Sequence, residues 1–348
     1  MSYTTINKSS LHMNTKIYTG DSGTNNSITG IGFKPDMVWL KNRTGSGNHF
    51  LWDVVRGANK TLVPNDTDTE ATSSYLGSFD TDGFTLTSAS NNTNSSSYNY
   101  VGWNWKANGA GSANTDGSIS STVSVNATSG FSIVKYTGNG TGNSTIGHGL
   151  GATPKFIIVK CISATQSWGT YSPSFVSASE PRVLYLNQTG SYANDTNVWG
   201  TSAVFNNSTF TVGDWAGSNA SGQTFIAYCF ADVQGYSKFG SYTGNGNVDG
   251  TFVYTGFKPA WLMVKNTATN SSWEIWDTKR NTFNPTAKSI FPDGAGAEYD
   301  YTNRVDLLSN GFKLKITDSS NTSGNSVIYM AFAEAPLVGS NGVTAKAR

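Results

Sequence analysis

The feature that most constrains this chain is a set of five landmarks that recurs three times in the same order. Each copy opens with the tripeptide YTG, at Tyr18, Tyr136 and Tyr242. The landmarks that follow are an apolar strand entered through Gly and Pro (GFKPDMVWLKN, GATPKFIIVKC, GFKPAWLMVKN), a short apolar stretch (KTLVPND, RVLYLNQ, KSIFPDG), a Phe-centred strand (DGFTLT, STFTVG, NGFKLK) and an aromatic strand (YVGWNWKA, FIAYCFAD, VIYMAFAE). The sequence therefore predicts three tandem copies of one module of about 100 residues.

The landmark sequences are typical of β-strands. MVWLK, FIIVK and WLMVK are continuous apolar runs, which fit a central strand covered on both faces. Other strands alternate between apolar and polar residues, and Asp82-Gly83 and Asn310-Gly311 are strong turn signals. Because no window carries the apolar stripe of a helix, we expect an all-β chain of three β-sandwich repeats, each jelly-roll-like.

The repeat also divides the chain. We expect an N-terminal anchoring arm at residues 1–14, β-sandwich repeats at 15–108, 131–233 and 234–336, a polar linker at 109–130 and a C-terminal tail at 337–348. The arm is polar with alternating strand character, so we expect it to add to a sheet edge of a neighbouring subunit or anchor protein. Within the linker, the stretch from Ile119 to Val125 alternates like a strand.

Charge and hydropathy exclude two classes of partner. Charged residues make up 13% of the 348 residues, and the net charge is +1. A nucleic-acid binder needs a basic excess, so we expect no nucleic-acid partner. No apolar run approaches the roughly 18 residues that span a bilayer, and the start, MSYTTINKSS, has no apolar segment of a signal peptide. We therefore expect no membrane insertion and no Sec-type signal.

Positions that match in the repeats predict the core. Trp105, Phe230 and Phe332 share one apolar position, and Trp103, Tyr228 and Met330 share another. Trp52-Asp53 matches Trp276-Asp277, and an arginine follows each pair, at Arg56 and Arg280. This pattern predicts a buried Asp–Arg pair that braces a loop. The second copy departs from it, because Trp168 is followed by Gly169-Thr170-Tyr171 with no Asp and no Arg nearby.

The residues that carry catalysis or bind metals are sparse. His12, His49 and His148 have no HxH or HExxH spacing, and Cys161 and Cys229 form no CxxC, so we expect no transition-metal site and no cofactor. The two cysteines are predicted to be packing residues. The segment Asp80-Thr81-Asp82-Gly83 resembles part of a calcium loop but lacks the remaining ligands, so calcium stays open as an alternative.

Aromatic residues without counterparts in the other copies are the candidates for ligand contact. They are Trp199, Trp215 and Tyr192 in the second copy and Trp273 in the third, with Asn194 and Asp195 as hydrogen-bond partners. Loop aromatics flanked by Asn and Asp are how sugar-binding sites stack a ring and bind its hydroxyls. The competing interpretation is that these rings pack under their own loops or in a subunit interface.

Several long motifs resemble a protein family. IGFKPDMVWLKNR, WDVVRGANKTL, SFDTDGFTL, YVGWNWKA and TDGSISSTVSVNATSGFSIVKYTGNGTGNSTIGHGLGATPKFIIVK resemble a repeat module of virion and tail-fibre-like structural proteins of marine tailed phages, including cyanophages and pelagiphages. The resemblance covers the first two copies densely and the third more loosely. It implies a place in the virion and supplies no catalytic residues.

The resemblance and the residues together predict a non-enzymatic virion structural protein that is tail-associated or fibre-like and contacts the host surface. Its expected partners are other virion proteins, further copies of itself in a homo-oligomer (with a trimer favoured) and a host surface glycan. The alternatives are a capsid decoration or head-vertex protein and a carbohydrate-binding module. A polysaccharide depolymerase is disfavoured, because it needs paired carboxylates in a groove, and of the 22 acidic residues only Asp53 and Asp277 recur between copies.

Overall fold

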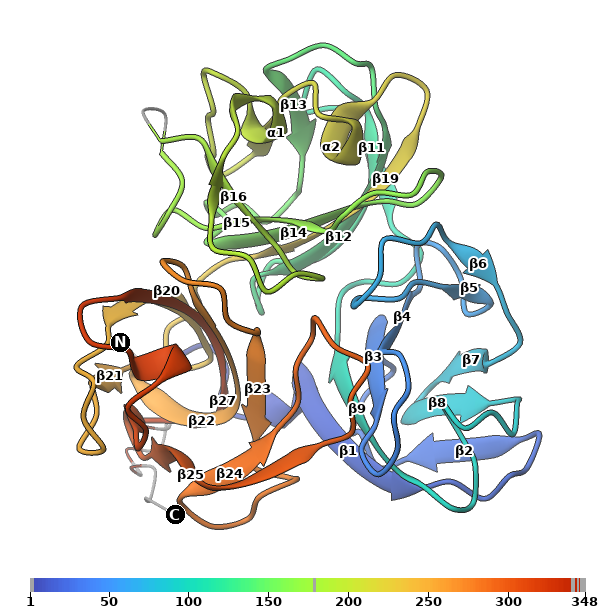
Figure 1. Ribbon diagram of the computed structural model, residues 1–348. Helices are drawn as coiled ribbons and strands as arrows, with labels where there is room; N and C mark the ends of the chain where they lie inside the picture. The colour runs from blue at the N-terminus through green and yellow to red at the C-terminus, as the bar shows by residue number, and fades with distance from the viewer. Residues whose placement is uncertain (1–2, 178–179, 339–341, 343, 345–348) are drawn as a thin grey trace.

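Three lobes surround a common centre (Figure 1), each built from one segment of the chain in sequence order. This computed structural model describes residues 3–177, 180–338, 342 and 344. Strands dominate every lobe, and the predicted all-β class is confirmed. The described residues contain no helix long and apolar enough to cross a membrane. We call the sheet of each lobe that faces this centre its inner sheet.

The first lobe consists of two antiparallel sheets and a short strand pair. Its inner sheet has the order β1 (Met13–Thr19), β9 (Asn99–Trp105), β3 (Met37–Asn42), β4 (Phe50–Asp53). Its second sheet has the order β2 (Asn26–Thr29), β8 (Gly83–Leu86), β7 (Leu76–Asp80), and the pair is β5 (Lys60–Thr61) with β6 (Ala71–Thr72). The predicted turn at Asp82-Gly83 joins β7 to β8.

The second lobe has the largest sheet. Its order is β10 (Ser112–Asn114), β11 (Ser121–Asn126), β12 (Phe131–Thr137), β19 (Thr224–Phe230), β14 (Phe156–Cys161), β15 (Gly169–Tyr171), β16 (Arg182–Tyr185), β17 (Ala193–Asn194). The lobe is completed by β13 (Ser144–Gly147), β18 (Thr209–Val212), α1 (Thr196–Trp199) and α2 (Ala216–Asn219). The segment 109–130, expected to be a linker, is instead part of this sheet, because β11 pairs with β12 along its full length.

The third lobe again has two sheets. Its inner sheet has the order β20 (Ser237–Thr243), β27 (Ser326–Pro336), β22 (Phe257–Asn266), β23 (Glu274–Asp277). The outer sheet has the order β21 (Phe252–Tyr254), β26 (Gly311–Leu314), β25 (Tyr299–Leu308), β24 (Thr286–Ser289). Two turns of 3-10 helix, η1 (Ser9–Leu11) and η2 (Ser319–Asn321), lie near it in the fold.

The inner sheets share one strand order and one register. The YTG strand lies beside the closing aromatic strand, which lies beside the apolar strand, in the orders β1-β9-β3, β12-β19-β14 and β20-β27-β22. In register, Met37 faces Trp105, Phe156 faces Phe230 and Trp261 faces Phe332. The positions matched from the sequence are therefore at matching places in the three sheets.

The continuous apolar strands are buried on both faces, as predicted. In β3, Val38 and Leu40 belong to the core within the first lobe, whereas Met37 and Trp39 belong to a core shared by all three lobes. Trp105, Phe230 and Phe332 meet in this central core, with ring centroids 5.8 Å (Trp105–Phe332) and 6.0 Å (Phe230–Phe332) apart. Each is at most 2% exposed, so the predicted burial is confirmed.

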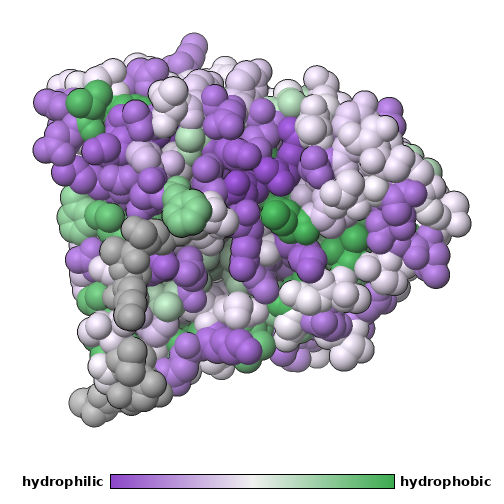
Figure 2. Space-filling model, turned by 90° about the horizontal axis from the view of Figure 1, so that it is seen from below, coloured by the Kyte–Doolittle hydropathy of each residue, from purple (hydrophilic) through white to green (hydrophobic). Residues whose placement is uncertain are grey.

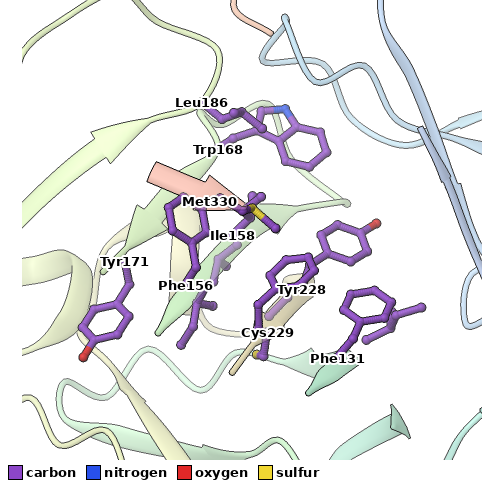
Figure 3. Packing of buried hydrophobic residues seen from close by; sticks show 14 of the residues in the cluster. Phe131, Phe156, Ile158, Trp168, Tyr171, Leu186, Tyr228, Cys229 and Met330 are labelled. Atoms are coloured by element: carbon purple, nitrogen blue, oxygen red, sulfur yellow. The ribbon is translucent and has the colours of Figure 1, made fainter. Parts of the chain in front are cut away.

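Side chains of all three lobes fill the centre. Figure 3 shows Met330, from the third lobe, lying against Ile158, Tyr228 and other side chains of the second. The central cavity that remains is only about 10 Å³, which is at the lower limit for a single water molecule. Aromatic pairs of this kind each contribute about 0.5–1.5 kcal/mol beyond the area that they bury. The lobes are thus joined by a packed core and not by flexible tethers.

The N-terminal arm packs on its own chain. The Tyr3 hydroxyl donates to the Gly256 carbonyl at 2.7 Å, and Thr4 Oγ1 donates to the Gln234 carbonyl at 2.7 Å. Ile6 is 2% exposed and belongs to the central core. The arm therefore fastens the first lobe to the third, where the sequence predicted an attachment to another subunit. The C-terminal tail expected at 337–348 lies mostly outside the described residues.

The view of the molecule from below shows a largely polar surface. In Figure 2 residues of hydrophilic and intermediate hydropathy cover most of this face, and hydrophobic ones form separate spots. This distribution agrees with a composition in which the apolar residues are gathered in the cores.

Candidate functional site at the junctions between the lobes

Three buried lysines, one per lobe, mark the junctions between the lobes. Lys41, Lys160 and Lys265 follow the apolar strand residues of β3, β14 and β22, and all three are 0% exposed. Each ammonium group donates to a carbonyl of the next lobe: Lys41 to Ala295 (3.5 Å), Lys160 to Thr67 (2.8 Å) and Lys265 to Thr189 (2.9 Å). We call these residues the junction lysines.

A ring nitrogen at a second shared position makes a parallel contact. His49, Trp168 and Trp273 each precede the strand that borders the apolar strand. Nε2 of His49 lies 3.0 Å from the Phe291 carbonyl, Nε1 of Trp168 lies 3.0 Å from the Asp66 carbonyl, and Nε1 of Trp273 lies 3.0 Å from the Tyr185 carbonyl. The contacts run in one direction around the ring, from the first lobe to the third, from the third to the second and from the second to the first.

The histidine is held in one protonation state. His49 Nδ1 accepts a hydrogen bond from Trp39 Nε1 at 3.0 Å, so Nε2 carries the proton that faces Phe291. Burial, together with the charge of Lys41, holds the pKa of His49 well below its usual value. His49 therefore acts as a neutral hydrogen-bonding group.

The predicted Asp–Arg pairs are present and buried. Nε of Arg56 lies 2.6 Å from Asp53 Oδ2, and Nε of Arg280 lies 2.5 Å from Asp277 Oδ2, with all four side chains inaccessible to solvent. Each arginine also donates to a carbonyl of the strand that precedes its loop, Arg56 to Leu51 in β4 and Arg280 to Ile275 in β23. The pairs brace their loops, as the sequence predicted.

The aspartates have a second partner that the sequence did not reveal. The Tyr228 hydroxyl donates to Asp53 Oδ2 at 2.7 Å, from the second lobe to the first. Trp103 Nε1 donates to Asp277 Oδ2 at 3.0 Å, from the first lobe to the third. Burial opposes ionisation of Asp277, but the Arg280 charge and the hydrogen bonds outweigh it, so the pKa of Asp277 lies below its usual value.

At the junction between the third and second lobes, other residues stand in place of both the donor and the aspartate. The third lobe has Met330 at the position of Trp103 and Tyr228, and methionine has no hydrogen to donate. The strand register places Tyr171, and not Trp168, at the position of Trp52 and Trp276. The aspartate position of the second lobe is accordingly Ser172, which is buried. The donor and the acceptor are thus absent together, and the described residues of this junction leave no buried carboxylate without its donor.

Burial sets the protonation of the junction lysines. Desolvation lowers the pKa of Lys41, of Lys160 and of Lys265 to about 8, although nearby carboxylates oppose it. A charge that is costly to bury is retained three times at one position, and each time it bridges two lobes. The arrangement can hold the lobes in a fixed order. Because the three ammonium groups are buried and bonded to carbonyl groups, they are not accessible to a substrate.

The ligand-contact residues predicted in the second lobe differ in their exposure to solvent. Trp199 is 0% exposed and packs edge-on against Tyr171 at 5.7 Å, so the expectation that it offers a stacking surface is wrong. Asp195 caps α1, its Oδ1 accepting from Asn197 N at 2.9 Å. Trp215 and Tyr192 are half-buried, Asn194 is exposed, and Tyr192 lies 4.2 Å from the Arg182 guanidinium.

The expectation that Trp273 in the third lobe contacts a ligand is also wrong. It is 1% exposed, lies in the central core and has a counterpart, Trp168, in the second lobe. Polar neighbours made Trp273 resemble an exposed loop residue. Its packing against the second lobe depends on contacts that are distant in sequence.

The other candidate groups have structural partners. Cys161 and Cys229 are buried free cysteines, which agrees with packing residues. Asp82 accepts from the backbone of Gly30 and Gly32, and Asp80 accepts from Thr85. Within the described part of the chain, no three His, Cys, Asp or Glu residues gather as metal ligands.

A signal for the junctions was present in the sequence. The same lysine ends each of the three apolar strands, in MVWLK, FIIVK and WLMVK. A lysine at a strand end is ordinarily interpreted as an exit to solvent. Its recurrence at a position flanked by buried residues was the available indication that it is itself buried.

Comparison with known proteins identifies a family. Residues 8–336 match the family described as Domain of unknown function (DUF7483). No curated protein and no solved structure matches the chain. The matched region includes all three lobes and their junctions.

Proposed function

The chain belongs to the DUF7483 family, and we propose that it is a non-enzymatic structural protein of a phage virion, associated with the tail and contacting the host surface. The resemblance of its repeat to tail-fibre-like virion proteins supports the place in the particle. The arrangement of the lobes supports the manner of attachment.

The observation that carries the proposal is the ring of one-directional contacts among three lobes of a single chain. Such head-to-tail contacts are those of a cyclic trimer, here made within one polypeptide. A trimeric fibre ends on a threefold axis, and one copy of this chain presents three similar lobes around such an axis. We therefore propose that one copy, and not a homotrimer, occupies each attachment point.

The ring equally favours a second candidate, a capsid decoration or head-vertex protein seated on a threefold axis of the head. Both candidates require a threefold partner and differ in the part of the particle that supplies it. A carbohydrate-binding module without attachment to a particle is a third candidate, and it needs no axis.

Reconstruction of whole particles without imposed symmetry, combined with antibody labelling, tests the proposal. We expect density for one three-lobed chain at a threefold position of the tail. Density on the head would favour the decoration protein, and absence from purified particles would overturn the proposal. Sedimentation of the purified chain should give its monomer mass of 37.1 kDa; a trimer mass would favour the homotrimer.

A further inference from the structure

A hollow of about 380 Å³ lies beside two exposed tyrosines in the third lobe. Tyr299 and Tyr301, two residues apart on β25, point to the same face and are 49% and 37% exposed. Their rings are nearly parallel, with an interplanar angle of 16° and centroids 6.1 Å apart. We call this hollow the tyrosine pocket. Its volume lies within the range of about 300–1,000 Å³ typical of small-molecule sites.

A buried ion pair forms the base of the tyrosine pocket. Arg304 Nε lies 2.8 Å from Glu274 Oε1, and Arg304 Nη2 lies 2.9 Å from Glu274 Oε2, a two-pronged contact. The guanidinium carbon lies 4.4 Å from the centroid of the Tyr301 ring. The ion pair therefore fixes the position of the exposed ring from beneath, and Ser289 Oγ, 2.6 Å from Glu274 Oε1, fixes the carboxylate.

The first lobe shows that the scaffold does not need this ion pair. The strand register puts Phe50 at the position of Glu274, because Phe50 faces Leu40 and Glu274 faces Val264. There the ring of Phe50 stacks on Tyr75 at 5.0 Å. Burying two charges in place of an apolar pair costs stability. Departures of this kind from the demands of packing are concentrated at functional sites.

The charges of the pocket indicate the class of ligand. Asp318 adds a carboxylate that is 69% exposed and lies 3.5 Å from Arg304 Nη1. With Glu274 and Asp318 against one guanidinium, the pocket has one carboxylate in excess and repels an anion. Aromatic rings beside an exposed carboxylate suit a ligand with an apolar ring face and neutral hydroxyl donors.

We infer that the tyrosine pocket binds a neutral glycan, with a sugar ring against Tyr299 and Tyr301 and a hydroxyl donating to Asp318. The outer sheet of the third lobe, and not the loops of the second, is then the sugar-contacting surface. This inference gives the host contact of the proposed function a place and a ligand class, and it does not depend on where in the virion the chain resides.

Calorimetric titration of the full chain with three neutral glycans (laminarin, mannohexaose and cellohexaose) and with acidic polygalacturonate tests the inference. We expect binding of at least one neutral glycan and weaker or no binding of polygalacturonate. The double variant Tyr299→Ala/Tyr301→Ala should lose at least tenfold in affinity. Tyr254→Ala is the matched control, because Tyr254 is a 56% exposed tyrosine of the same sheet outside this pocket.

Three outcomes would overturn the inference: no binding of any neutral glycan by the wild type, unchanged binding by the double variant, or tighter binding of polygalacturonate. Asp318→Asn, which keeps the shape of the side chain, separates the hydrogen bond from a loss of folding, and we expect it to weaken binding severalfold at an unchanged unfolding temperature. Particle reconstruction is independent of these titrations, so failure of the glycan site and failure of the virion assignment are distinguishable.

Discussion

At the scale of single residues, the buried aspartates Asp53 and Asp277 each receive a hydrogen bond from a neighbouring lobe. Tyr228 donates to Asp53 and Trp103 donates to Asp277. Met330, which has no hydrogen to donate, meets no carboxylate among the residues that the structure describes. A buried carboxylate that loses one of its donors is costly, so donor and acceptor have to change together.

We expect Tyr228→Phe to lower the free energy of unfolding by about 1–3 kcal/mol, because it leaves a buried Asp53 oxygen with one donor fewer. Tyr171→Phe is the control, since Tyr171 is equally aromatic and buried but its hydroxyl has no hydrogen bond within the described chain. Denaturant titration of both variants measures the difference. Equal losses would show that the Tyr228–Asp53 contact adds nothing.

The junction lysines make stability depend on pH. Their pKa values are lowered to about 8 in the fold, from 10.5 in an unfolded chain. Between these values the unfolded chain binds more protons than the folded chain, so stability rises with pH, by up to about 1.4 kcal/mol per pH unit for each lysine. The rise should end near pH 10, because burial raises the pKa of Tyr136 and of Tyr242 well above 10 and deprotonation then favours unfolding.

Denaturant titrations from pH 7 to pH 10 measure this rise. We expect no dependence of this origin below pH 8 and increasing stability above it. Lys160→Met should reduce the slope, whereas Lys34→Met, at an exposed position, should leave it unchanged. A flat profile in the wild type would show that the junction lysines titrate normally.

At the scale of elements, local pattern was sufficient for the strands and insufficient for their partners. Alternation and turn residues predicted the strands, because each of these signals lies within about ten neighbouring residues, and the threefold recurrence repeated the same prediction in each copy. The segment 109–130 looked like a linker because its residues are polar. Its strand β11 pairs with the edge of β12, and this pairing cannot be inferred from the segment's own residues. Trp199 and Trp273 were misplaced for the same reason, because burial is decided by elements far away in sequence.

The N-terminal arm illustrates how one element joins two lobes. We expect Ile6→Ala to lower the free energy of unfolding by about 2–5 kcal/mol, because Ile6 fills the central core. Ile17→Ala is the control: Ile17 is 40% exposed on β1, and its loss should cost well under 1 kcal/mol. Thermal unfolding of both variants decides the matter, and equal shifts would mean that the arm does not stabilise the fold.

At the scale of the whole molecule, the central core makes the three lobes one cooperative unit. Its aromatic residues come from all three lobes, and its cavity is lined by all of them. A lobe that unfolded alone would expose the inner sheets of its two neighbours. The division into three repeats in the sequence therefore does not correspond to three independently stable domains.

We expect a single transition in scanning calorimetry, with calorimetric and van't Hoff enthalpies in agreement. The second lobe alone, residues 109–233 with β10 and β11 included, should fail to give a sharp transition, because it loses the apolar surface that covers its inner sheet. Two or three separate transitions in the full chain would contradict the shared core.

The head-to-tail order of the junctions has a consequence for how the molecule responds to dilution. A trimer of separate chains is held by an equilibrium with its subunits, so it dissociates when the protein becomes scarce. Because the three lobes belong to one chain, each keeps its neighbours at an effective concentration that dilution does not change. The ring therefore closes in one molecule as readily as in many, and its three lobes stay assembled at any protein concentration, however low.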